Sequence, residues 1–246
     1  FDQDVRQTVA EGLQRRGVVI RPHTRVAGLA RRDGRIAVQI DGGEVLMVDQ
    51  VMMATGRAPN TRGLGLEACG VALGGQGEIK VDGQSRTSVP GIYAVGDVTD
   101  RVNLTPWAIA EGRALAETLY NNNPMQADAE NVPAAVFSQP PVATVGLSEE
   151  DARKRYGNVR VYRSRFRPMK NTLSGRDEQT MMKLVVDDAS DRVVGCHMVG
   201  PDGPEIIQGL AIAMKCGATK RQFDQTIGLH PTAAEEFVTM RDPVGA

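Results

Sequence analysis

The sequence predicts an α/β fold that continues into an α+β domain, and three observations carry this prediction. A continuous apolar run at Val51–Ala54 precedes a Thr-Gly pair, as in strands that are covered on both faces. A similar run at Ile92–Val95 ends at Gly96. Beyond a polar segment at 121–133, the pattern changes to several strands with helices between them. Because α/β folds bind ligands at the carboxyl ends of such strands, the first two runs also predict binding loops.

Two helices are expected before the polar segment. The first spans 3–16, because apolar residues recur there every four positions and Asp2 or Asp4 can cap its start. The second consists of small apolar residues and spans 106–120. Thr105 is expected as its N-cap, and a proline suits its first position.

The remaining strands of this half follow from turn signals. Asp33-Gly34 is a strong hairpin signal between two half-apolar segments. A second glycine-rich turn follows the hairpin. The strands expected here, besides the two apolar runs, are 18–20, 25–31, 35–40 and 44–48.

The second half predicts an α+β unit with its own core. Ser148 and the acidic residues after it predict the start of a short helix. Glycine ends the helix expected at 205–216. The other expected elements are strands at 142–147, 159–166, 181–186 and 193–199, and helices at 219–225 and 233–240.

Composition excludes several classes of function. The 246 residues are 41% hydrophobic and 24% charged, and 29 basic against 30 acidic residues give a net charge of −1. Without a cationic excess, nucleic acid is not expected as a partner. No apolar run reaches the roughly 20 residues of a membrane-spanning helix, and the start lacks a signal peptide pattern. We therefore expect a cytoplasmic protein without a membrane partner.

The cysteines and histidines predict no metal site and no disulfide framework. Cys69, Cys196 and Cys216 are far apart in the sequence, and no histidine lies near them with ligand spacing. We expect three buried or semi-buried thiols in a reducing compartment.

Two glycine-terminated strand ends are candidate cofactor sites. After the first, Gly56 permits close approach of a cofactor and Arg57 can face a phosphate. After the second, Asp97 can accept hydrogen bonds from sugar-like hydroxyls. A plain exit from a strand explains the first equally well, and an ordinary turn cap explains the second.

The third constellation lies near the C-terminus. Thr232 and Glu235 have the spacing of a capping box, so His230 should lie on a rigid loop directly before a helix. Glu235 can reach back to the imidazole and orient it for acid/base chemistry. A surface histidine beside an ordinary capping box is the alternative.

Together, these motifs resemble one family over essentially the whole chain, the flavin-dependent pyridine nucleotide–disulfide oxidoreductases. Thr87–Asp97 resembles the second FAD motif of that family, Ala54–Thr61 its nucleotide-domain exit, and His230–Glu235 its His-Pro-Thr-x-x-Glu element. Phe166–Thr172 and Ala233–Arg241 are most similar to the branch that reduces glutathione disulfide.

The resemblance implies a fold, cofactors and partners. The fold would be the remainder of Rossmann-like FAD- and NAD(P)-binding domains followed by a C-terminal α+β dimerisation domain. Residues 1–58 would end the NAD(P)-binding domain, 59–128 would be the second FAD segment, and 129–246 would be the dimerisation domain. The cofactors would be FAD and NADPH, and the partners glutathione disulfide and a second copy of the chain.

The resemblance also assigns roles to individual residues. His230 would be the general acid/base that protonates the leaving thiolate, paired with Glu235 and acting in the partner subunit's active site. The residues implied near the cofactors are Gly56, Arg57, Gly96, Asp97, Leu104 and Thr105. Those implied near the disulfide substrate are Arg113, Met169, Lys170, Thr232 and Glu236.

Three parts of the family pattern are absent from these residues: the redox dithiol, the first glycine-rich FAD loop and the NADPH phosphate loop. We therefore expect these residues alone to show no disulfide reductase activity. Two alternatives stay open. One is a lipoamide dehydrogenase or another reductase of low-molecular-weight disulfides, and the other is a non-catalytic dimerisation module.

Overall fold

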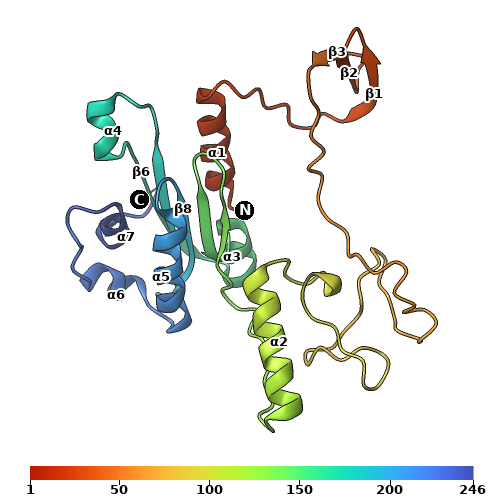
Figure 1. Cartoon of the computed structure of the whole chain (residues 1–246). Coiled ribbons are helices and arrows are strands. Elements are labelled where there is room, and N and C mark those ends of the chain that lie inside the picture. The colour runs from red at the N-terminus through yellow and green to blue at the C-terminus, as the bar shows by residue number, and fades with distance from the viewer. Residues whose placement is uncertain (246) are drawn as a thin grey trace. The chain divides into compact units, whose positions relative to one another are not determined.

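The computed structural model describes residues 1–245, which form two compact units, each with its own sheet (Figure 1). The C-terminal unit joins Phe1–His23 to the chain from Glu130 onward, and the other unit is Thr24–Ala129. The change of unit at residue 129 falls inside the expected linker. The two units are defined by contacts within the chain and do not test the domain bounds 1–58, 59–128 and 129–246. These bounds remain predictions.

Five antiparallel strands form the sheet of the C-terminal unit, in the order β4-β5-β8-β7-β6. Every residue of β7 is buried, as expected for a strand with neighbours on both sides and helices over both faces. The bounds predicted for β6 and β8 are confirmed. The strands are β4 (Ala134–Val136), β5 (Val142–Gly146), β6 (Val159–Phe166), β7 (Thr180–Asp187) and β8 (Val193–Val199).

The two faces of this sheet carry different helices. On one face, Val5 of α1 packs against Val142, Met181 and Val199. On the other, Ile207 of α5 joins the core that contains Met182. Successive side chains of a strand point to opposite faces, so adjacent methionines of β7 serve the two layers. These helices are α1 (Gln3–Arg15), with α3 (Glu149–Tyr156) packed near it, and α5 (Gly203–Lys215).

Short helices complete the C-terminal unit. The helix expected at 233–240 is instead a 3₁₀ turn, η2 (Ala233–Glu235), followed by α7 (Glu236–Thr239). The reason is local, because the Glu235 carboxylate turns to His230 and supplies no cap to a longer helix. The others are α4 (Met169–Ser174) and α6 (Lys220–Gln225).

In the other unit, Asp33-Gly34 forms the predicted hairpin turn, with φ of 50° and 78°. The sheet is antiparallel in the order β1-β2-β3. Thr105 was expected as a cap, but it is the first helical residue and Leu104 is the N-cap. The elements are β1 (Val26–Arg32), β2 (Arg35–Ile40), β3 (Val45–Val48), the 3₁₀ turn η1 (Gly96–Thr99) and α2 (Thr105–Tyr120).

Three strand predictions are wrong. Residues 18–20, 51–54 and 92–95 form no strand, although Tyr93 makes an isolated bridge to Arg86. Met52 is 87% exposed, in place of the burial that its apolar run predicted. A strand requires a neighbour to accept and donate its backbone hydrogen bonds, and the described residues place no strand beside 51–54.

Candidate functional site

His230 and Glu235 form a hydrogen-bonded pair. The imidazole Nδ1 lies 3.1 Å from each carboxylate oxygen of Glu235. His230 is exposed, whereas Glu235 is half-buried. A Cβ at Gly228 would lie 3.1 Å from the Cβ of Glu235, so glycine lets the loop pass close to this carboxylate. A carboxylate only accepts hydrogen bonds, and it therefore fixes a proton on Nδ1.

The predicted capping box does not form. The Thr232 hydroxyl donates to the carbonyl of Leu229 at 2.6 Å and caps no helix. Glu235 uses both oxygens on His230. The contact between histidine and glutamate was therefore predicted from an incorrect local motif. The Glu235 carboxylate bonds the His230 ring across the loop, in place of the expected capping-box bond at the helix start.

A groove of about 850 Å³ gathers most of the predicted substrate residues. It is lined by the start of α4, by the loop after His230 and by η2. Arg113 is not among its lining residues, since it lies on α2 in the other unit. The predicted site residues at the groove are Met169, Lys170, Thr232, Glu235 and Glu236.

Charges of both signs line this groove. Arg167 and Lys170 are its cations, and Asp202 joins the two glutamates as its anions. Met169 is 79% exposed and adds an apolar surface. Such a lining suits a flexible molecule that carries both ammonium and carboxylate groups.

A second group of predicted residues meets in the other unit. The Arg57 guanidinium lies 2.7 Å from the Asp97 carboxylate, and it also donates to the carbonyl of Asn103 at 3.0 Å. Both charged side chains are at least half-exposed. Gly56 has a φ of 112° and open space at its Cβ position. The two strand ends that the sequence singled out therefore come together through an ion pair.

Gly96 fixes the position of Asp97. Its φ is 74°, and an added Cβ would lie 3.0 Å from the Cβ of Ala108. Its N–H donates to the buried Glu111 carboxylate at 2.6 Å. Glycine is therefore required both for the backbone conformation and for close packing on α2.

Sequence reasoning missed Glu111 and Arg101. Glu111 is 2% exposed and forms an ion pair of 2.7 Å with Arg101. An acidic residue flanked by the small apolar residues of α2 was the available signal. Leu104 and Thr105 begin the same helix, so Glu111 connects the predicted cofactor residues at the start of α2 to the Gly96 loop.

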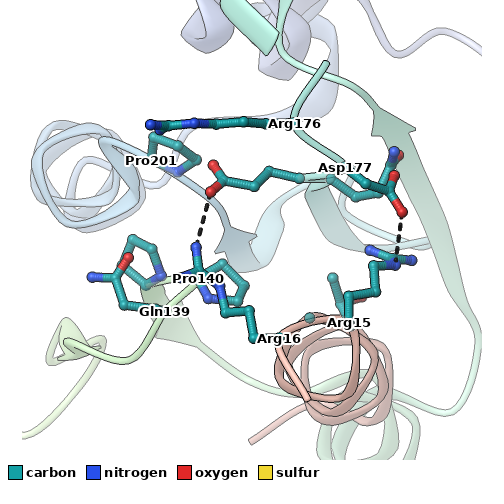
Figure 2. Close-up of a pocket in the computed structure, with 12 residues that line it drawn as sticks. Arg15, Arg16, Gln139, Pro140, Arg176, Asp177 and Pro201 are labelled. Atoms are coloured by element: carbon teal, nitrogen blue, oxygen red, sulfur yellow. Dashed lines mark hydrogen bonds and ion pairs between the residues drawn. The ribbon is translucent and has the colours of Figure 1, made fainter. Parts of the chain in front are cut away.

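A second hollow, of about 690 Å³, lies between α1 and the segment before β7, and Figure 2 shows it. Arginines on the α1 side of this hollow pair with carboxylates on the opposite side. Arg15 pairs with Asp177 at 3.7 Å, and Arg16 pairs with Glu178 at 2.9 Å. None of the predicted site residues lines it. These pairs join α1 to the segment before β7 and leave the groove beside η2 as the candidate substrate site.

A buried charge cluster joins the other end of α1 to the sheet. Lys183 of β7 is 1% exposed, and its ammonium lies 2.9, 2.7 and 2.8 Å from carboxylates of Asp2, Asp4 and Glu149. Burial opposes the charged ammonium, but these hydrogen bonds outweigh it and raise the pKa of Lys183. Burial likewise opposes the Asp2 carboxylate, but the Glu149 N–H and Lys183 lower its pKa.

His197 lies beside this cluster and is almost fully buried. Its Nδ1 lies 2.5 Å from the Thr144 hydroxyl, and its Nε2 lies 3.0 Å from the carbonyl of Leu147. Burial lowers the pKa of His197. We therefore assign it a structural place in the sheet, in contrast to the exposed His230.

The cysteines carry no redox pair among residues 1–245. All three thiols are free, and burial raises the pKa of Cys196. Cys69 and Cys216 are exposed, so the expectation of burial was wrong for both. The described residues also contain no cluster of three possible metal ligands. None of the helices described is long and apolar enough to cross a membrane.

Comparison with protein families defines the class. Residues 1–112 match the pyridine nucleotide-disulphide oxidoreductase model, and residues 132–241 match the dimerisation domain of the same family. The structure is similar to the HOCl-induced flavoprotein disulfide reductase RclA from Escherichia coli, with a TM-score of 0.87 and 27% identity. That match covers 96% of this chain and 54% of the other. The chain belongs to the pyridine nucleotide-disulphide oxidoreductases.

Individual relatives indicate which branch of this family the chain is most similar to. A glutathione reductase of Burkholderia cepacia is 55% identical, over 98% of this chain and 54% of its own length. The chloroplastic/mitochondrial glutathione reductase of Pisum sativum is 52% identical, over 86% of this chain and 38% of its own. A trypanothione reductase of Trypanosoma congolense is 43% identical, over 99% and 50%. The chain thus spans about half the length of its relatives or less.

Proposed function

We propose that this chain is part of a flavin-dependent reductase of glutathione disulfide, in which His230 is the general acid/base. His230 pairs with Glu235, and Glu235 lines a groove together with four of the five predicted substrate residues; this arrangement carries the proposal. Sequence identity to glutathione reductases of 52 to 55% supports the branch. The net reaction uses NADPH and one proton to convert the disulfide into two thiols.

The histidine pair defines where the proton moves. Nδ1 faces Glu235, so Nε2 is the ring nitrogen that remains for substrate. Cleavage of a disulfide releases a thiolate. The protonated ring donates from Nε2 to that sulfur, and the thiol leaves neutral. Glu235 orients the imidazole and stabilises its positive charge, as a carboxylate does for other catalytic histidines.

The residues in the other unit fit FAD. Asp97 offers an exposed carboxylate to the hydroxyls of the ribityl chain, and Gly96 permits close approach beside it. The start of α2, at Leu104 and Thr105, offers the positive end of a helix to the flavin ring. Gly56 and Arg57 would border the nicotinamide nucleotide. FAD held by these residues would supply two-electron transfer between NADPH and the disulfide.

Glutathione disulfide suits the groove chemically. It carries ammonium and carboxylate groups, and the groove presents Lys170 and Arg167 together with Glu236 and Asp202. Arg113, on α2, stays a predicted substrate contact. Trypanothione disulfide is the second candidate, because a trypanothione reductase is 43% identical. Lower identity than to the glutathione reductases ranks it second.

A homodimer is the proposed assembly, as the match to a dimerisation domain suggests. Large apolar side chains are exposed near the groove. Leu173 is 98%, Ile227 94% and Leu229 75% exposed. In such a dimer, His230 would serve the active site of the partner subunit. A reducing cytoplasm suits an enzyme that forms thiols, and the three free cysteines fit that compartment.

A chimera tests this function. The part of the Burkholderia cepacia relative that this chain does not cover would be fused to this chain. We expect NADPH-dependent reduction of glutathione disulfide, and a loss of about 10²- to 10⁴-fold in His230→Asn. The matched control, His23→Asn, should retain full rate. An active chimera that is unaffected by His230→Asn would refute the catalytic role. A folded, flavin-containing chimera without turnover would favour a non-catalytic dimerisation module.

A further inference from the structure

The segment that carries His230 begins and ends at one ion pair. Asp224 lies near the end of α6, and Arg241 follows α7. The Asp224 carboxylate lies 3.1 Å from the Arg241 guanidinium. The chain between them leaves α6, carries His230 and Glu235, and returns through α7. The ion pair therefore closes this segment at its base.

Lys220 anchors the Asp224 carboxylate. Its ammonium pairs with Asp224, is 2% exposed, and lies 4.2 Å above the ring of Tyr162. Its backbone N–H donates to the carbonyl of Asp191 at 2.8 Å. Because an unpaired buried cation is costly, Lys220 holds Asp224 in place. One carboxylate thus links a fixed cation of α6 to the partly exposed Arg241.

Between these helices, the segment has little packing of its own. Phe223 and Phe237 are buried at its two sides, at 5% and 1% exposure. By contrast, Ile227 is 94% and Leu229 is 75% exposed. His230 is exposed as well. The location of the loop consequently depends on its two ends, on the packing of Ala233 against the core and on a few local hydrogen bonds.

We propose that Asp224 is a positioning residue for the His230–Glu235 pair. His230 lies on the loop, whereas Glu235 lies at the junction with α7. Any shift of α7 away from α6 lengthens the bond between Nδ1 and the carboxylate. The clasp of Asp224 on Arg241 opposes that shift. The importance of this ion pair for turnover rests on the function proposed above. Its effect on the geometry of the His230–Glu235 pair does not.

Ring nitrogen NMR of His230 tests the proposal in the whole 246-residue chain. In the neutral ring, the pair places the proton on Nδ1, and ¹⁵N shifts report which nitrogen carries it. Glu235→Ala defines complete loss of this signature. We expect Arg241→Gln to move the signals from the wild-type values toward those of Glu235→Ala. Arg241 is 54% exposed, and Lys220 keeps its partner in this variant.

The control is Arg155→Gln, which removes an arginine of 57% exposure from a pair elsewhere on the unit. It should leave the His230 signals unchanged. Asp224→Asn should shift the signals at least as far as Arg241→Gln. Asp224→Glu keeps a carboxylate, so its signals should stay near the wild-type values. If Asp224→Asn fails to fold, Arg241→Gln decides the matter alone. Wild-type ¹⁵N shifts in a folded Arg241→Gln variant would overturn the proposal. This readout needs no turnover, so it is independent of the chimera assay.

Discussion

The two compact units differ in where they place their methionines. In the C-terminal unit, Met181 and Met182 are fully buried on the two faces of β7. In the other unit, Met52 and Met53 are 87% and 66% exposed in a segment that reads as a buried strand. Both pairs lie in strongly apolar runs. Pairing with neighbouring strands, and not local sequence, decides which run becomes a core.

The charged groups of the two units also differ in burial. Lys183 is enclosed by three carboxylates in the C-terminal unit, whereas Arg57 and Asp97 form an exposed pair in the other. The buried Lys183 cluster therefore stabilises the C-terminal unit, whereas the exposed pair lies at the candidate cofactor site of the other unit.

The largest expected effect comes from Lys183→Met, which leaves the buried Asp2 carboxylate without its cation. We expect a loss of about 3–5 kcal/mol in the free energy of unfolding. The measurement is hydrogen exchange of β7 amides in the intact chain. Lys154→Met is the control, because Lys154 lies in exposed pairs on α3, and it should cause no measurable change. Equal stability of the two variants would contradict the account of the cluster.

Truncating one methionine in each unit comes next. Met182→Ala should destabilise the C-terminal unit by about 2–5 kcal/mol, because it removes a buried side chain and leaves a cavity. Met53→Ala should alter stability by no more than about 0.5 kcal/mol. Urea unfolding followed by amide exchange measures both. A large cost for Met53→Ala would indicate that residues 51–54 are packed after all.

Acid should weaken the C-terminal unit in two stages. The lowered pKa of His197 means that the unfolded chain binds the proton first, so stability falls as pH drops below about 6.5. The lowered pKa values of Asp2 and Glu149 add a second loss below about pH 4. Unfolding free energies measured at pH 7, 5 and 3 should decrease in that order. A constant value would show that these groups titrate alike in both states.

A smaller effect is expected at the cofactor loop. Gly96→Ala forces a side chain into a φ of 74° and against Ala108, at a cost of about 1–2 kcal/mol or more. Gly91→Ala is the matched control, because its φ is 83° and its Cβ position is open. Fluorescence of Trp107, the only tryptophan, reports unfolding of this unit. Equal costs for the two variants would remove the role given to packing on α2.

Sequence predicted local structure well where local chemistry decides it. The Asp33-Gly34 turn requires positive φ, and β6 is an edge strand with half-apolar alternation, so both were recovered. The run at 51–54 failed because strand formation depends on a partner. The burial and pairing of Lys183 could not be predicted for the same reason, since its three carboxylates lie far from it in the sequence.

The candidate site divides in a similar way. The contact of His230 with Glu235 was predicted, because the two residues lie only five positions apart in the sequence, on one loop. The ion pair of Arg57 with Asp97 was not, since it joins positions 40 residues apart. The roles of Glu111 and Asp224 required the packed structure.

Binding of glutathione disulfide to the groove is the most direct test of the account. Methyl NMR of the intact chain would follow Met169 at the groove, with buried Met182 and exposed Met53 as internal references. The account predicts a saturable shift of the Met169 methyl signal, while the signals of both reference methyls remain in place. Titration to saturating disulfide without any change at Met169, or with equal changes at Met53, would contradict it.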